Sequence, residues 1–78
     1  MPTELTSGRN RLFFYARDRD EPPHVHVIKA ENEAKIWLEP VELETNRGYN
    51  RSELNRVLKL TELHQAQLLE AWNEHFDR

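Results

Sequence analysis

Seventy-eight residues, carrying 11 Lys and Arg against 14 Asp and Glu, allow one small domain of net charge −3. Charged residues make up 32% of the chain and apolar residues 37%, a balance typical of a soluble domain with a thin core. Cysteine is absent, which excludes disulfides, cysteine-ligated zinc sites and thiol nucleophiles. The mild acidity argues against a protein that coats nucleic acid in bulk.

Neither a membrane span nor a signal peptide is expected. The apolar runs are only a few residues long, far short of the roughly 20 residues that a transmembrane helix needs. The first residues, Met-Pro-Thr-Glu, lack the basic and apolar regions of a secretory signal. The sequence therefore predicts a cytoplasmic protein.

The first two-thirds of the chain reads as strands. Residues 11–17 are rich in aromatic side chains, which favours a strand. Pro22 and Pro23 close a polar turn, because proline cannot donate a hydrogen bond to a sheet. Two further strands are predicted over residues 24–29 and 34–38. A short fourth strand could follow.

Residues 51–77 read as helical. Asn50 is a suitable N-cap, and Glu53 three residues later completes the pattern of a capping box. Apolar residues then recur at steps of three and four, but this stripe weakens around His64. The region is therefore either two helices or one bent helix. We expect a single α+β domain over residues 1–78, in which a small, mostly antiparallel sheet of three or four strands packs against this helical unit.

Alternation along the strands sorts their side chains onto two faces of the sheet. The face predicted to lie under the helices carries Leu12, Phe14, Val25, Val27, Ala34, Ile36 and Leu38. The opposite face carries Phe13, Tyr15, Arg17, His24, His26, Ile28, Lys35 and Trp37. The second set is too aromatic for a plain solvent surface. We expect this face to be covered by a partner, by the amino-terminal segment or by a ligand.

His24 and His26 form the most suggestive local pattern, because alternate strand residues point the same way. Two imidazoles so placed can ligate a divalent metal, with Asp18 or Asp20 as further ligands, or can divide acid and base roles. The plainer interpretation is structural, with one ring nitrogen of each histidine bonded to backbone. No catalytic residue is assigned, and His24 and His26 are only candidates. No cofactor is expected beyond the divalent metal that this pair could bind.

A basic stretch suggests contact with phosphates. Between positions 46 and 60 there are four basic residues and only one acidic residue. The basic residues are Arg47, Arg51, Arg56 and Lys59. A second cluster comprises Arg9, Arg11, Arg17 and Arg19. If the clusters meet beside aromatic side chains, they could contact single-stranded RNA. The alternative is a solvated helix face.

Several blocks together resemble one known family. They are Met-Pro-Thr at residues 1–3, Phe-Phe-Tyr at 13–15, Glu-Pro-Pro-His-Val-His-Val at 21–27, Ala-Lys-Ile-Trp-Leu-Glu-Pro-Val at 34–41, Asn-Arg-Gly-Tyr at 46–49 and the ending at 68–76. Over nearly its full length the chain resembles the bacterial domain-of-unknown-function family 4160. The resemblance implies no assigned activity. It implies a small accessory protein often encoded beside another small domain, an arrangement similar to toxin–antitoxin pairs.

The chain departs from the family pattern at two places. Ala16-Arg17 stands where many members have Ser-Asn, and Arg19-Asp20 stands where others have Asp-His. The histidine that those members have just before the prolines is therefore missing here. Its absence removes a third possible ligand or catalytic group beside His24 and His26, which weakens the metal and nuclease hypotheses.

The sequence thus favours an interaction protein, one component of a toxin–antitoxin-like pair, that binds a protein partner or a second copy of itself. A small RNA-directed nuclease or RNA-binding protein, and a metal-binding module, are the alternatives. The expected binding residues are Phe13, Tyr15, Arg17, His24, His26, Trp37, Arg47, Arg51 and Arg56.

Overall fold

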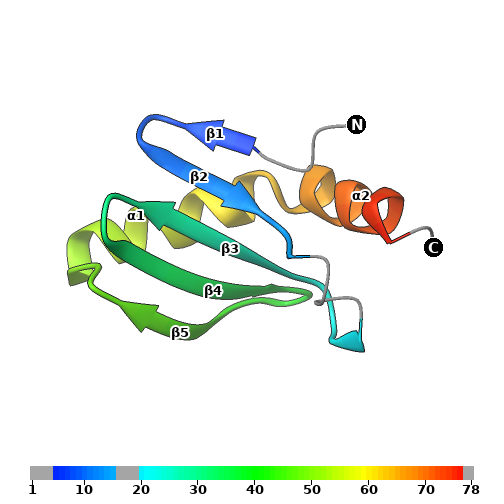
Figure 1. Cartoon of the computed structure of the whole chain (residues 1–78), viewed down its shortest axis with the longest axis horizontal. Helices are drawn as coiled ribbons and strands as arrows, with labels where there is room; N and C mark the ends of the chain where they lie inside the picture. Colours follow the sequence, from blue (N-terminus) through cyan, green and yellow to red (C-terminus); the bar gives the residue numbers. More distant parts are fainter. Residues whose placement is uncertain (1–4, 16–19, 77–78) are drawn as a thin grey trace.

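A computed structural model describes residues 5–15 and 20–76 of the chain. One antiparallel sheet has its strands in chain order, and two helices lie on one of its faces (Figure 1). This arrangement confirms the predicted α+β class. The elements are β1 (Leu5–Ser7), β2 (Asn10–Phe13), β3 (His24–Lys29), β4 (Asn32–Leu38), β5 (Val41–Arg47), α1 (Arg51–Leu63) and α2 (Gln65–His75).

The sheet has five strands where the sequence predicted three or four. The missed strand β1 pairs with β2 through a turn at Gly8, whose φ of 61° suits glycine. Strand β2 ends at Phe13, whereas the prediction extended the strand to residue 17. Strand β5 is seven residues long, lies at the edge of the sheet and is mostly exposed. Its largely polar sequence therefore indicated a strand only weakly.

Two further backbone positions shape the turns. Ala30 has a φ of 55° in the two-residue turn between β3 and β4. Gly48 has a φ of 101°, and its α-carbon faces Asn32, so that a side chain there would collide with the Asn32 amide. Only glycine therefore fits the connection between β5 and α1.

The core lies between the sheet and the helices. All seven side chains assigned to the helix-facing side by alternation are buried, which confirms that assignment. The helices contribute Val57, Leu68, Trp72 and Phe76. The ring of Trp72 packs edge-on against Phe14 at 5.3 Å and against Phe76 at 4.3 Å.

The helical region divides at His64. Its φ of −105° and ψ of 16° depart from helical values, so α1 ends before it and α2 begins after it. Thr61 donates its hydroxyl to the Val57 carbonyl within α1, a bond that often accompanies helix bending. Of the two arrangements that the sequence allowed, the structure has two helices.

At the amino end of α1, the Asn50 side chain accepts the Glu53 amide at 2.8 Å, as the N-cap prediction requires. The Glu53 carboxylate binds Lys29 of β3. It thereby ties the first turn of the helix to the sheet. Neither helix in the described part of the chain has the length and apolar character needed to cross a bilayer.

Candidate interaction surface on the open face of the sheet

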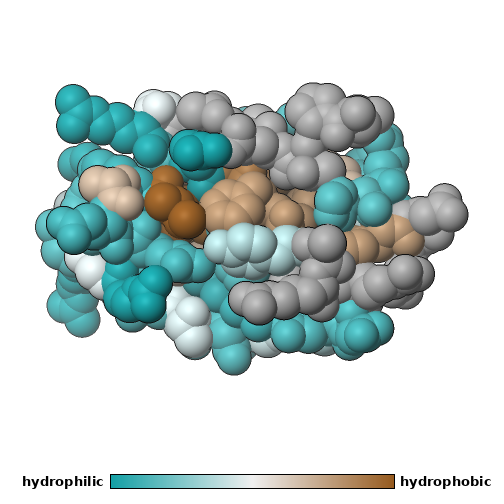
Figure 2. All heavy atoms as spheres, in the orientation of Figure 1, coloured by the Kyte–Doolittle hydropathy of each residue, from teal (hydrophilic) through white to brown (hydrophobic). Residues whose placement is uncertain are grey.

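The sheet face turned away from the helices, here called the open face, carries a row of large side chains. Phe13 lies opposite His26 on β3, and Trp37 of β4 lies opposite His24, so these four share the face. The His24 ring also contacts Trp72 of α2, at the end of β3 that β2 does not cover. Ile28 continues it toward the end of β3. A band of apolar atoms crosses the centre of this face, which Figure 2 views directly.

The apolar side chains of the open face are only partly buried. Four of them have intermediate exposure. They are Phe13 of β2, Tyr15 just after β2, Ile28 of β3 and Trp37 of β4. Phe13 and Tyr15 meet edge-to-face at 5.0 Å. Among the described residues, the one large hydrophobic side chain that counts as exposed is Leu63, at the end of α1.

The two histidines lie together, but they are buried rather than presented on the surface. His24 is 0% exposed and His26 is 8% exposed, with 5.1 Å between their ring centroids. Rings from both ends of the chain surround them: Tyr15 lies 4.5 Å from His26, and Trp72 of α2 lies 5.2 Å from His24. An acid–base role would need substrate access to these rings, so their burial favours the structural interpretation.

His24 also has the backbone bond that the structural interpretation expects. Its Nδ1 lies 2.9 Å from the Pro22 carbonyl oxygen. A carbonyl can only accept, so Nδ1 carries the proton in this contact. This bond fixes the ring at the point where the two prolines enter β3.

Charged pairs surround the aromatic row. Lys35 binds Glu21 at 2.6 Å and lies 5.0 Å above the Trp37 ring, a cation–π contact. Trp37 donates its Nε1 hydrogen to Glu44 of β5 at 3.1 Å. Arg47 binds Glu33 at 3.0 Å beside an open depression of about 370 Å³. The open face thus has an apolar centre and a polar, ion-paired rim.

The proposed metal ligands are only partly placed. Asp18 lies outside the described residues, and so does Arg17 of the expected binding set. Asp20 is described and exposed. Within residues 5–15 and 20–76, no group of three or more histidine, aspartate or glutamate side chains is arranged to hold a metal ion.

The predicted basic stretch divides between two sides of the molecule. Arg47 belongs to the open face through its pair with Glu33. Arg51 and Arg56 lie exposed on α1. Of the amino-terminal cluster, Arg9 and Arg11 are described and exposed, and Arg19 lies outside the described residues.

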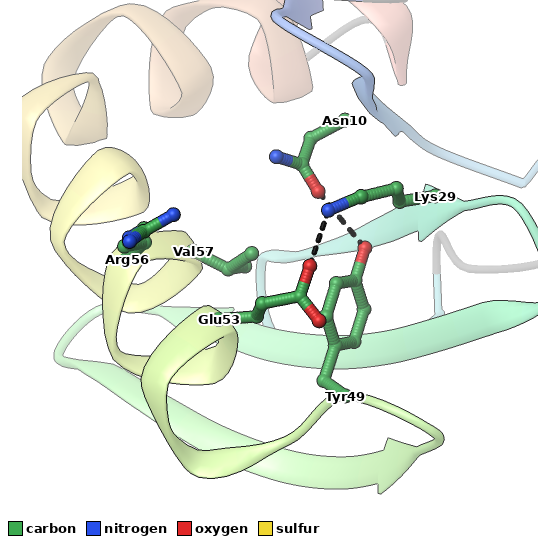
Figure 3. Close-up of a pocket in the computed structure, with 6 residues that line it drawn as sticks. All are labelled: Asn10, Lys29, Tyr49, Glu53, Arg56 and Val57. Carbon is green, nitrogen blue, oxygen red and sulfur yellow. Dashed lines mark hydrogen bonds and ion pairs between the residues drawn. The ribbon is translucent and has the colours of Figure 1, made fainter.

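Sequence reasoning missed a polar cluster between α1 and the sheet (Figure 3). Tyr49 is 5% exposed and donates its hydroxyl to Asn10 Oδ1 at 3.0 Å. The adjacent Lys29–Glu53 pair and Arg56 line the same cavity of about 50 Å³. Burial raises the pKa of Tyr49, and the Glu53 carboxylate raises it further. The contacts join residues up to 39 positions apart, so no local pattern could reveal them.

Comparison with known proteins places the chain in a family. The model of a family described as Domain of unknown function (DUF4160) matches residues 10–73. This range includes the whole open face from β2 to β5 and nearly all of α2. No curated protein and no solved structure matches the chain.

Proposed function

Because the chain belongs to the DUF4160 family, whose function is unknown, we propose from its surface that it is a protein-interaction module. The proposed function is to dock another protein on the open face, as one component of a toxin–antitoxin-like pair. The observation that carries the proposal is the row of partly buried Phe13, Tyr15, Ile28 and Trp37 across three strands opposite the helices.

The composition of the open face supports this proposal. Aromatic side chains at the centre and charged pairs at the rim are typical of protein–protein interfaces. The Trp37 ring is held by Glu44 on one side and Lys35 on the other, so it is already ordered before a partner arrives. A pre-ordered side chain loses less conformational entropy on binding, which favours its use as an anchor.

The kind of occupant follows from the shape and charge of the face. The depression at its corner is lined by Glu33, Thr45, Asn46 and Arg47, all of them polar. This depression is therefore poorly suited to an apolar small molecule, and the aromatic centre with its charged rim matches a protein surface better. Pairing with a small neighbouring protein, which the family resemblance implies, would supply such a surface.

The test is co-expression of the chain with the product of the adjacent gene, followed by purification and analytical sedimentation. Trp37→Ala is expected to weaken the complex by about 2 kcal/mol or more, a roughly 30-fold rise in Kd, because aromatic anchors dominate interfaces. Leu63→Ala is the matched control, since it removes an exposed apolar side chain from α1, outside the open face. It should leave the Kd unchanged.

Thermal unfolding of each variant alone separates binding from stability. If no complex forms, or if Leu63→Ala and Trp37→Ala weaken it equally, the open face is not the docking surface. If the chain instead forms a homodimer that Trp37→Ala disrupts, the face is an interface between two copies and the paired-system proposal is wrong.

A further inference from the structure

The outward side of α1 carries three cations without partners in the described part of the chain. Arg51, Arg56 and Lys59 are all exposed. None of them takes part in an ion pair or hydrogen bond with the residues that the structure describes. We call this surface of Arg51, Arg56 and Lys59 the basic face of α1.

The one acidic side chain between Arg51 and Lys59 is already paired. Glu53 turns toward the sheet and binds Lys29, as Figure 3 shows, whereas Arg56 lies at the mouth of the same cavity. Glu53 is therefore engaged elsewhere, and the next acidic residue of α1, Glu62, comes after the last of the three cations. The first turns of α1 keep their positive charge although the chain has a net charge of −3.

The spacing of the three cations suits a rigid polyanion. At 3.6 residues per turn they lie within about 140° of the helix circumference, with the exposed polar Ser52 and Asn55 between them. Arg51 and Lys59 are separated by a rise of about 12 Å. Over that length a nucleic acid duplex presents about seven phosphate charges.

We infer that the basic face of α1 binds the phosphate backbone of a nucleic acid duplex. Three side chains can reach phosphates on one edge of the duplex, and the amino end of the helix adds a partial positive charge. No residue of α1 is aromatic, and the partly exposed rings of Phe13, Tyr15 and Trp37 belong to the open face, so bases have no platform on which to stack beside these cations. Contact with the backbone of a duplex therefore fits better than readout of a single strand.

The remaining charges set the orientation of the complex. The exposed side of α2 carries Glu70 and Glu74, and Glu62 is exposed near the end of α1. These carboxylates repel phosphates. The duplex should therefore approach α1 between Arg51 and Lys59 and leave α2 and the open face free.

The binding assay is fluorescence anisotropy with a labelled DNA duplex and a labelled RNA duplex at several salt concentrations. We expect a Kd of about 10⁻⁴–10⁻⁶ M. A plot of the logarithm of the association constant against log[salt] should be linear, with a slope of about −0.9 for each phosphate contact. The triple variant Arg51→Gln, Arg56→Gln, Lys59→Gln should lose binding at every salt concentration. Each single variant should reduce the slope by about 0.9. Glutamine keeps the helix propensity high, and circular dichroism checks that the variants fold.

Lys35→Gln is the matched control, because it removes one positive charge from the open face and should leave the affinity unchanged. Trp37→Ala should also bind the duplex normally, so this inference and the proposed docking function can fail separately. Three results would overturn the inference: full binding by the triple variant, tighter binding of single-stranded RNA than of either duplex, or equal binding of anionic lipid vesicles. Failure to bind any duplex at low salt would overturn it as well.

Discussion

Tyr49 is the residue whose chemistry departs most clearly from that of an exposed side chain. Burial and the Glu53 carboxylate raise its pKa above the usual 10.0, because both disfavour the tyrosinate anion. The folded chain therefore keeps this proton at a pH at which the unfolded chain has lost it. The stabilisation is complete below about pH 10 and is lost as pH rises from 10 through the folded-state pKa.

Tyr49→Phe should therefore flatten the fall in unfolding free energy above about pH 10, because phenylalanine has no proton to lose. Denaturant titrations at several pH values measure this slope. Tyr15→Phe, at the second of the two tyrosines, is the control for loss of a tyrosine hydroxyl as such. An unchanged slope in Tyr49→Phe would show that another group controls the alkaline transition. The same control leaves Tyr49 as the sole tyrosine, so its tyrosinate absorbance reports the raised pKa directly.

At the scale of single residues, strand alternation predicted which side chains form the core, because burial on one face follows from a period of two. It also placed His24 and His26 side by side. It could not predict their burial, since His24 is enclosed by Trp72, which lies 48 positions later in the chain. Contacts between distant segments depend on how the helices cross the sheet, and local sequence does not encode that.

At the scale of elements, the start of α1 rests on one capping side chain and one link to the sheet. Asn50→Ala removes the acceptor for the Glu53 amide and should lower the unfolding free energy by about 1 kcal/mol. For a domain of this size the melting temperature should fall by about 4–8 °C. Ser52→Ala, two residues further along and exposed, is the control and should change stability by less than about 0.5 kcal/mol. Equal losses in the two variants would mean that the cap contributes nothing.

Elements were predicted well where the sequence pattern was strong. Aromatic and β-branched residues indicated two strands close to the observed β3 and β4. The apolar stripe and the Asn50 cap indicated helices close to the observed α1 and α2. The two edge strands were harder. β1 has three residues, and β5 alternates little because most of its side chains face solvent. Their pairing comes from the sheet beside them and only weakly from their own composition.

At the scale of the whole molecule, one layer of side chains between the sheet and two helices supplies the core. A chain of this length has an unfolding free energy of about 4–12 kcal/mol, at roughly 0.05–0.15 kcal/mol per residue. Ile36 is 0% exposed at the centre of that layer. Replacing a buried isoleucine by alanine typically costs about 2–5 kcal/mol, which is a large share of the total.

Ile36→Ala should therefore lower the melting temperature by at least about 8 °C and leave a measurable unfolded population at moderate temperature. Leu63→Ala should shift it by no more than about 4 °C, because that side chain is 78% exposed and buries little on folding. Calorimetry and urea denaturation at two protein concentrations provide the measurement. A small effect of Ile36→Ala that grows on dilution would show that association, rather than the single core layer, supplies most of the stability, because a dimer's stability depends on its concentration.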